Sequence, residues 1–480
     1  MRPLALGDIA RWCEARLLGE ADAADLRIDA VAIDTRKLEP DDGRRVLFVA
    51  LRGENHDAHD HLDEAIARGA GVLLVSHAID TDLPQLLCGD TEQALGEIAA
   101  GAQQGRSATV VALTGSNGKT SVKTLLLGIL ERASSDGMSR AYANPGNRNN
   151  EIGLPLAVLD APEDAQYAIY EMGAGKPGDI AYLTSIVRPQ VALVNNIAPA
   201  HLERMGTLLG VAQTKGAIYE ALSSDGIAVI NADDAFAPYF ATLVQGRRVL
   251  RFGLDASADI TARALHIGVD CSHFELATPA GEVRIALPLP GRHNVMNALA
   301  ATALALGAGV ALDTIRDGLD NARQVPGRQI AHTLASGAVL IDDSYNANPG
   351  SVEAALAALA AAGGEAWLVL GDMAELGEGA ELLHAQVGDS ARNKCIARLY
   401  TVGVNSRAAT RAFGPNARHF DDKQSLIEAL SSEIRAGVRV LVKGSRSSAM
   451  DQVAVALLAA SSSPESPASS LRSTGGVHAA

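Results

Sequence analysis

The sequence predicts an α/β protein of three domains: a central P-loop-type parallel-sheet domain, a C-terminal Rossmann-like doubly wound domain and a smaller N-terminal α/β domain. The length of 480 residues exceeds what one hydrophobic core usually serves. Strand and helix patterns alternate on both sides of residue 325, as parallel sheets require. A glycine loop near residue 115 joins a buried strand pattern to a helical one.

We place the domain boundaries at residues 1–106, 107–325 and 326–460. Residues 461–480 are mostly Ser, Pro, Gly and Ala, and we expect a disordered tail there because so few of them can be buried.

Composition narrows the class of partner. The formal net charge of −15 disfavours nucleic acid or an anionic membrane, since both attract basic patches. Four scattered cysteines without a CxxC pair are typical of a reducing compartment and offer no zinc site. The N-terminus lacks the apolar run of a signal peptide, and residues 298–312 are too short to span a bilayer. We therefore expect a cytoplasmic protein without membrane insertion.

The first 106 residues are predicted to form a helix over 6–18 and strands over 31–34, 46–50 and 71–75. Cationic or titratable side chains gather beside the turns that follow these strands. They are Arg36, Arg52, His56, His59 and His61. Such residues are either ordinary surface groups or the contacts of a diphosphate in an otherwise acidic protein.

In the central domain, the strand over 109–113 runs into Gly115–Thr120, and helical spacing begins at Thr120. Backbone N–H groups at a first helical turn, the positive end of the helix dipole and the Lys119 ammonium favour a bound phosphate. Thr120 would offer its hydroxyl to Mg²⁺. The loop is shorter than GxxxxGK[ST], because position 113 is Leu, and the alternative is a plain tight turn with a solvated lysine.

The rest of this domain alternates strands over 167–171, 191–195 and 227–231 with helices over 178–187 and 208–222, followed by antiparallel strands within 248–290. Functional residues are expected at the carboxyl ends of parallel strands.

Glu171 and His201 follow two of these strands, which we take to be neighbours, and with Thr120 they would reach one metal ion. Alternatively, Glu171 caps the next helix and His201 is an ordinary core or surface residue. Lys215, on a helix, would by itself be interpreted as solvated.

The C-terminal domain repeats the alternation, with strands within 338–344, 366–372, 397–403 and 438–445 and helices near 351–362 and 381–392. Polar residues again end its strands. They are Asp343, Tyr345, Asn346, Asn348, Asp372 and Lys443. Ligand sites favour the interface between two such domains, and Gly327 beside Pro326 is our candidate for a hinge.

Several motifs together resemble the Mur ligase family over residues 25–460: DTRKLEPDDG, TGSNGKTSVK, GNRNNEIGLPL, ALVNNIAPAHLE, GRHNVMNALAA, IDDSYNANPGS and LVKGSRSSAM. The loop motif and GRHN mark the family, while YNANP, GNRNN and KGSR narrow the resemblance to the branch that adds D-alanyl-D-alanine. The resemblance implies a monomeric, ATP-dependent ligase that joins D-alanyl-D-alanine to UDP-N-acetylmuramoyl-tripeptide through an acyl phosphate.

The resemblance also implies the ATP contacts and the catalytic set. The loop residues that would bind ATP are Thr114, Gly115, Ser116, Asn117, Gly118, Lys119, Thr120 and Ser121. Asn294 would bind adenine, Arg328 the γ-phosphate and Asp343 the ribose. The implied catalytic residues are Lys119, Lys215, His201 and Arg328.

Two Mg²⁺ ions are implied, one on Thr120 and Glu171, the other on His201 with a carbamylated Lys215. The N-terminal domain would bind UDP. The implied substrate contacts are Asp34, Thr35 and Arg36 for UDP, Asn147, Asn149 and Asn150 for the growing substrate, and Tyr345, Asn346 and Asn348 for the dipeptide.

Three alternatives remain open: a Mur-type ligase that adds a single amino acid, the related folylpolyglutamate synthase, and a nucleotide-dependent switch without ligation. YNANP and the UDP-type first domain count against the synthase, and the complete phosphate and metal constellations count against the switch.

Overall fold

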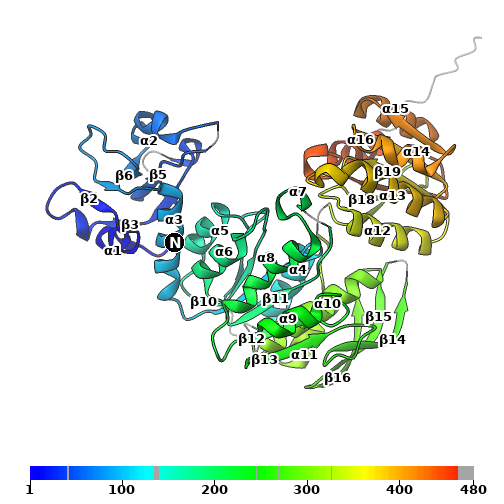
Figure 1. Ribbon diagram of the computed structural model, residues 1–480, viewed down its shortest axis with the longest axis horizontal. Helices are drawn as coiled ribbons and strands as arrows, with labels where there is room; N and C mark the ends of the chain where they lie inside the picture. Colours follow the sequence, from blue (N-terminus) through cyan, green and yellow to red (C-terminus); the bar gives the residue numbers. More distant parts are fainter. Residues whose placement is uncertain are drawn as a thin grey trace, which may run out of the picture. The chain divides into compact units, whose positions relative to one another are not determined.

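The computed structural model describes residues 1–39, 43–53, 55–133, 140–199, 201–244, 246–268, 270–325 and 327–462 (Figure 1). The chain forms two compact units, one of residues 1–325 with 375–379 and the other of residues 326–374 with 380–480. Most of the predicted tail, residues 463–480, lies outside the described residues.

The N-terminal part of the first unit is a sheet in the order β2 (Arg16–Leu18), β7 (Gln85–Leu87), β6 (Ala70–Val75), β5 (Val46–Val49), β4 (Ala30–Ala32), with β2 as an antiparallel edge. Two short strands, β1 (Leu4–Ala5) and β3 (Arg27–Ile28), pair separately. Helices α2 (Leu62–Ala67) and α3 (Thr91–Gln104) complete it.

The predicted helix over 6–18 is wrong in its second half. Helix α1 spans Leu6–Trp12, and Glu14 adopts φ of +48°, which ends the helical path. Residues 16–18 then pair with β7, so pairing with a distant strand overrides the local helical pattern.

The central sheet is parallel, in the order β13 (Arg248–Phe252), β12 (Ile227–Asn231), β11 (Val191–Val194), β8 (Thr109–Thr114), β10 (Ala165–Glu171), β9 (Arg140–Ala143). Alternate residues of β8 enter different cores, Val110 and Ala112 on one face and Val111 and Leu113 on the other. Both faces are therefore covered, as a parallel sheet requires.

Helices α4 (Lys119–Ala133), α10 (Arg292–Gly307) and α11 (Leu312–Asp320) share the core of one face. The other face carries α5 (Gly153–Asp160), α6 (Asp179–Val187) and α8 (Leu208–Glu220), and the same core continues into the N-terminal part. The shorter helices α7 (Leu202–Met205) and α9 (Ala237–Leu243) lie in the connections.

Two expectations about this sheet need correction. The range 248–290 expected to be antiparallel is too wide at its start, because β13 pairs in parallel with β12 as the edge of the central sheet. The antiparallel sheet comprises only β14 (Thr261–Ile267), β15 (Ser272–Thr278) and β16 (Gly281–Leu287). In addition, β10 and β11 are not neighbours, because β8 lies between them.

The second unit is doubly wound, as predicted. Its strand order is β17 (Ile330–Thr333), β18 (Val339–Asp343), β22 (Val438–Lys443), β19 (Glu365–Gly371), β20 (Arg398–Val402), β21 (Ala417–Phe420), parallel except for β17. Its helices are α12 (Pro349–Ala361), α13 (Ala380–Asn393), α14 (Arg407–Phe413), α15 (Lys423–Glu433) and α16 (Asp451–Ser462).

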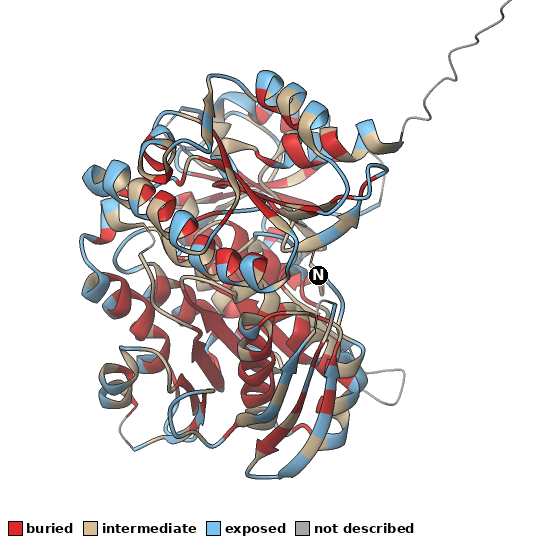
Figure 2. Ribbon diagram, turned by 90° about the vertical axis from the view of Figure 1, so that its right-hand side faces the viewer, coloured by how far each residue is buried: buried red, intermediate tan, exposed pale blue. Residues whose placement is uncertain are grey.

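Figure 2 shows buried residues concentrated in the strands and on the inward faces of the helices. Over the described ranges, every helix is too short or too polar to cross a lipid bilayer.

Candidate active site

The glycine loop joins β8 to α4, as the sequence predicts. Gly118 has φ of +76°, and a Cβ at this position would lie 2.5 Å from Asn297 Oδ1 and 2.7 Å from Asn195 Nδ2. Only glycine fits both this backbone conformation and this close approach. Lys119 lies across the loop, and its Nζ donates to the Gly115 carbonyl at 2.7 Å.

The loop is braced by the segment after β11. The Ser116 N–H donates to the Asn196 carbonyl at 2.9 Å, and the Asn117 N–H donates to Asn196 Oδ1 at 2.8 Å. Ser116 Oγ donates to Ala198 O at 3.0 Å. Because these two amides are paired within the protein, phosphate contacts are expected chiefly from the first turn of α4.

Thr120 and Glu171 meet beside this loop, as the resemblance implies. Thr120 Oγ1 donates to Glu171 Oε2 at 3.0 Å, and Asn149 Nδ2 donates to Glu171 Oε1 at 3.0 Å. The alternative that Glu171 caps the next helix is wrong, because the N-cap of α6 is Gly178. Thr114, in contrast, points inward and donates to Met172 O at 2.9 Å.

Lys123 was not among the predicted site residues, yet it lies in the same network. Its side chain is 7% exposed, and its Nζ lies 3.1 Å from Glu171 Oε2 and donates to Asn144 O at 2.9 Å. Burial alone would raise the pKa of Glu171, but the ammonium groups of Lys123 and Lys119 outweigh burial and leave this pKa below its usual range. Glu171 is therefore an anion at neutral pH.

Lys215 is buried inside α8, so its interpretation as a solvated lysine is wrong. Burial lowers the pKa of the Lys215 ammonium well below its ordinary value, and the positive charge of Lys119 lowers it further. Burial near Lys119 therefore favours the neutral amine form of Lys215.

His201 precedes α7 with φ of +54°, and its Nδ1 lies 2.5 Å from Glu375 Oε2. Among the described residues, no three His, Cys, Asp or Glu side chains form a ready metal cluster. Any metal ion here would need further oxygen ligands.

The other asparagines of GNRNN have local roles. Asn150 Oδ1 accepts from the Gly153 N–H at 2.9 Å at the start of α5. The Asn147 carbonyl accepts from the Asn149 N–H at 2.8 Å. In α10, Asn294 Nδ2 donates to Pro290 O at 2.7 Å.

Residues of the second unit form their own group at the ends of β18 and β22. The buried Lys443 Nζ donates to Asp343 Oδ2 at 2.7 Å and to Asn346 O at 3.0 Å. The Arg328 guanidinium lies 4.6 Å from the ring centre of Tyr345. Asn348 caps α12, since its Oδ1 accepts from the Ser351 N–H at 2.9 Å.

The residues expected to bind UDP, which are Asp34, Thr35 and Arg36, follow the carboxyl end of β4. Asp34 accepts from Arg36 Nε and Nη2 at 2.9 Å each, and this pairing lowers the pKa of Asp34 to about 2. Thr35 begins a short 3₁₀ helix with Arg36. Because β4, β5 and β6 are parallel, Arg52 after β5 and Ser76 after β6 lie along the same sheet edge.

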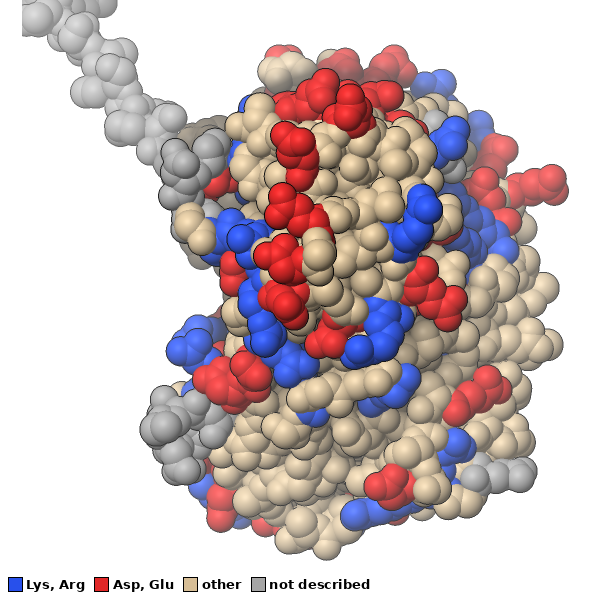
Figure 3. Space-filling view, turned by 90° about the vertical axis from the view of Figure 1, so that its left-hand side faces the viewer, with Lys and Arg blue, Asp and Glu red and all other residues tan. Residues whose placement is uncertain are grey.

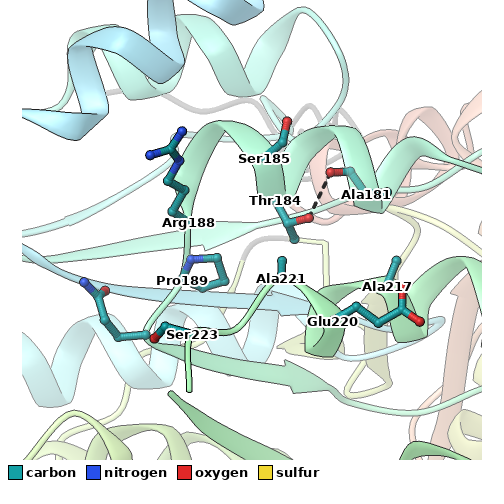
Figure 4. Close-up of a pocket in the computed structure, with 10 residues that line it drawn as sticks. Ala181, Thr184, Ser185, Arg188, Pro189, Ala217, Glu220, Ala221 and Ser223 are labelled. Atoms are coloured by element: carbon teal, nitrogen blue, oxygen red, sulfur yellow. Dashed lines mark hydrogen bonds between the residues drawn. The ribbon is translucent and has the colours of Figure 1, made fainter. Parts of the chain in front are cut away.

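A separate pocket of about 580 Å³ lies between α6 and α8 (Figure 4). Its lining includes Arg188, Pro189 and Gln190, which precede β11. The pocket is therefore at the opposite end of the parallel strands from the glycine loop and contains none of the predicted site residues. On the face drawn in Figure 3, acidic and basic side chains are interspersed.

The parallel central sheet and its glycine loop, with Lys119 and the contact between Thr120 and Glu171, are typical of enzymes that bind nucleotide phosphates. The comparison with protein families agrees with this class. Residues 113–305 match the Mur ligase middle domain, and residues 327–446 match the Mur ligase glutamate ligase domain. The chain belongs to the Mur ligase family, whose members are ATP-dependent ligases.

Within this family, the chain is similar to proteins named for the ligation of D-alanyl-D-alanine. The chain is 47% identical to UDP-N-acetylmuramoyl-tripeptide–D-alanyl-D-alanine ligase of Escherichia coli strain K12, over 92% of this chain and 96% of the relative. The crystal structure of MurF from Acinetobacter baumannii is similar with a TM-score of 0.88 and 31% identity, covering 96% and 99% of the two chains. MurF from Thermotoga maritima in complex with ADP gives a TM-score of 0.80 and 26% identity, covering 90% and 97%.

Proposed function

We propose that the chain joins D-alanyl-D-alanine to UDP-N-acetylmuramoyl-tripeptide with conversion of ATP to ADP and phosphate. The observation that carries this proposal is the 47% identity to a ligase of that name over nearly the full length of both chains. The geometry of the glycine loop supports the proposal. Thr120 and Glu171 lie in contact where they could bind a metal ion, and Lys119 lies across the loop where it could bind phosphate.

The residues present fit Mg²⁺. A hard cation that binds through one or two carboxylates, a hydroxyl and the phosphates of a nucleotide suits Thr120 and Glu171. The absence of a three-residue cluster within the described ranges fits the same picture, since Mg²⁺ keeps phosphate and water ligands. When bound, Mg²⁺ would neutralise charge on the phosphoryl group.

Carbamylation of Lys215 is also part of the proposal. Carbon dioxide adds to a neutral amine, and burial lowers the pKa of Lys215, which favours that neutral form. Loss of one proton then leaves an anionic carbamate, an oxygen ligand that with His201 would hold a second Mg²⁺. Activity lost in Lys215→Ala should return with short carboxylic acids, and failure of all of them would count against the carbamate.

The chemistry begins with activation of a carboxylate. The terminal carboxylate of the tripeptide attacks the γ-phosphorus of ATP, ADP leaves, and an acyl phosphate forms. The amine of D-alanyl-D-alanine then attacks the acyl carbon, phosphate leaves with the former carboxylate oxygen, and the nitrogen loses a proton. Lys119 and Arg328 would stabilise the phosphoryl charge by position and electrostatics.

The remaining contacts are proposed as follows. Thr114 to Ser121, Asn294 and Asp343 would bind ATP. Asp34, Thr35 and Arg36 would bind UDP, whereas Asn147, Asn149 and Asn150 would face the tripeptide. Tyr345, Asn346 and Asn348 would line the dipeptide site.

We further propose that the chain has three domains, with boundaries at 106/107 and 325/326 and a hinge at Gly327. We also propose that the protein is a monomer and that it is cytoplasmic, a location that the four free thiols favour.

Phosphate release from ATP tests the proposed function. The full chain should release phosphate only with both UDP-N-acetylmuramoyl-tripeptide and D-alanyl-D-alanine present. Release that does not depend on the dipeptide would overturn the proposal. Release with a single amino acid in place of the dipeptide would favour another Mur ligase, and release with a folate and glutamate would favour the synthase.

A further inference from the structure

A short segment of the chain's C-terminal half belongs to the first compact unit. Residues 375–379 cluster with that unit although the residues on both sides of them belong to the second. Gly377 has φ of +67°, and a Cβ built there would lie 3.3 Å from Glu203 Cα in α7. The segment therefore packs backbone to backbone on the turn that follows His201.

One side chain of this segment reaches the His201 ring. Glu375 Oε2 lies 2.5 Å from His201 Nδ1. Both residues have left-handed backbone conformations, with φ of +54° at His201 and +60° at Glu375. Non-glycine residues in this region are energetically unfavourable and cluster at functional sites. The surrounding structure thus holds both His201 and Glu375, the two partners of this contact, in unfavourable backbone conformations.

The contact decides which ring nitrogen is available. A carboxylate at Nδ1 accepts a hydrogen bond from Nδ1–H, so Nε2 of the neutral ring keeps its lone pair. Histidines that bind metals usually donate their other N–H to a carboxylate or carbonyl, which fixes the tautomer and the ring orientation.

We propose that Glu375 is a positioning residue for His201, holding the Nδ1–H tautomer and leaving Nε2 to a divalent cation. This inference rests on the proposed function, in which His201 binds the second Mg²⁺. A plain ion pair is the competing explanation, because the two side chains are 33% and 59% exposed and exposed pairs contribute little.

The test compares Glu375→Ala and Glu375→Gln with Glu378→Gln in the full chain. Glu378 is an exposed residue of the same segment, so its replacement removes the same charge without touching His201 Nδ1. Two readouts are used: the tautomer of His201 by ¹⁵N NMR of histidine-labelled protein without metal, and Mn²⁺ binding by electron paramagnetic resonance with a non-hydrolysable ATP analogue.

The wild type should bind two Mn²⁺ ions and show a protonated Nδ1 at His201. Glu375→Ala should weaken the second ion by about 10–100-fold and lose the tautomer preference, whereas Glu378→Gln should do neither. Glu375→Gln, whose amide oxygen still accepts from Nδ1–H, should fall between them.

Two results would overturn the inference. If the wild type binds two ions and the Glu375 variants match it in affinity and tautomer, Glu375 does not position His201. If the wild type binds only one ion, both this role and the second-metal part of the proposed function fail. The dependence of phosphate release on D-alanyl-D-alanine is measured separately, so the ligase activity itself stays distinguishable.

Discussion

Lys215 is a residue whose burial works against folding. The Lys215 amine binds its proton more weakly in the folded chain than in the unfolded chain, where its pKa has the ordinary value of 10.5. Burial of the unmodified amine therefore destabilises the protein at neutral pH. This loss shrinks as pH rises toward that ordinary value. Lys215→Met, of similar shape and without charge, should raise the free energy of unfolding by about 1 kcal/mol or more and reduce ligase activity by about 10²-fold.

Urea unfolding of the full chain in carbonate-free buffer with a chelator measures the first effect. The control is Gln213→Met, an exposed position on the same helix, where stability should change little. A Lys215→Met variant that is less stable than the wild type would contradict the conclusion that burial of this amine destabilises the folded chain.

Lys123 is the residue whose loss should be most damaging near the loop. Without its ammonium, the Glu171 carboxylate is buried with much less positive charge beside it, and breaking a buried pair costs about 3–5 kcal/mol. The folded pKa of Glu171 lies below its ordinary value, so in the wild type this group stabilises above that value and the contribution disappears as pH falls through the folded pKa.

In Lys123→Met, protonation of Glu171 relieves an uncompensated charge, so the stability deficit should be largest near pH 7 and shrink on acidification. Unfolding by urea at several pH values checks this. The exposed Lys176→Met serves as the control, and a deficit independent of pH would argue against the pairing.

The sequence grouped Thr120, Glu171 and His201. Thr120, in the first turn of α4, does contact Glu171 at the carboxyl end of β10, because β10 lies beside the strand that leads into the glycine loop. Lys123, Asn195 and Asn196 were not predicted. Their roles depend on which strands become neighbours and on how a loop folds back, and neither leaves a local pattern in the sequence. The doubled asparagine directly after β11 was the one available signal.

At the scale of elements, the contact between α13 and α14 depends on a missing side chain. A Cβ at Gly388 would collide with the Ala409 carbonyl oxygen of α14. Gly388→Ala should therefore force the helices apart and destabilise the protein by about 1–3 kcal/mol, although alanine favours helices.

Gly128→Ala provides the matched control, because Gly128 also lies within a helix but its Cβ would meet only the far end of Arg132 at 4.0 Å. That change should stabilise by about 0.5–1 kcal/mol. Thermal unfolding of both variants measures these two changes in stability. If both substitutions stabilised the protein, or both destabilised it, the packing of α13 on α14 would not explain the effect of Gly388→Ala.

Most elements were predictable because buried strands and amphipathic helices carry their own period, as for β8 and α4. The failures were at the edges. Arg16–Leu18 is an edge strand whose partner, β7, lies far away in sequence, so its local pattern resembles the end of a helix. Arg248–Phe252 is also an edge strand, and the sequence did not show that it pairs in parallel with the preceding strand, β12. Asn348, assigned to substrate, proved to be also a helix cap, a role that its position before Pro349 already indicated.

At the scale of the whole molecule, the two compact units have separate cores. One core of the first unit runs from the N-terminal part into the central sheet, and another covers the opposite face of that sheet. The strands of the second unit contribute to a different cluster with α15 and α16. Because the core of one unit can unfold while the core of the other stays folded, calorimetry should show two unfolding transitions.

A pair of leucine truncations assigns these transitions. Leu126 in α4 and Leu430 in α15 are both fully buried, and Leu→Ala at such positions costs about 2–5 kcal/mol. Leu126→Ala should lower the midpoint of one transition only, and Leu430→Ala that of the other. ATP with Mg²⁺ should raise the transition that Leu126→Ala lowers, because the glycine loop belongs to that unit. If each truncation shifted both transitions by the same amount, the units would unfold as one cooperative body and the separation of their cores would have no thermodynamic meaning.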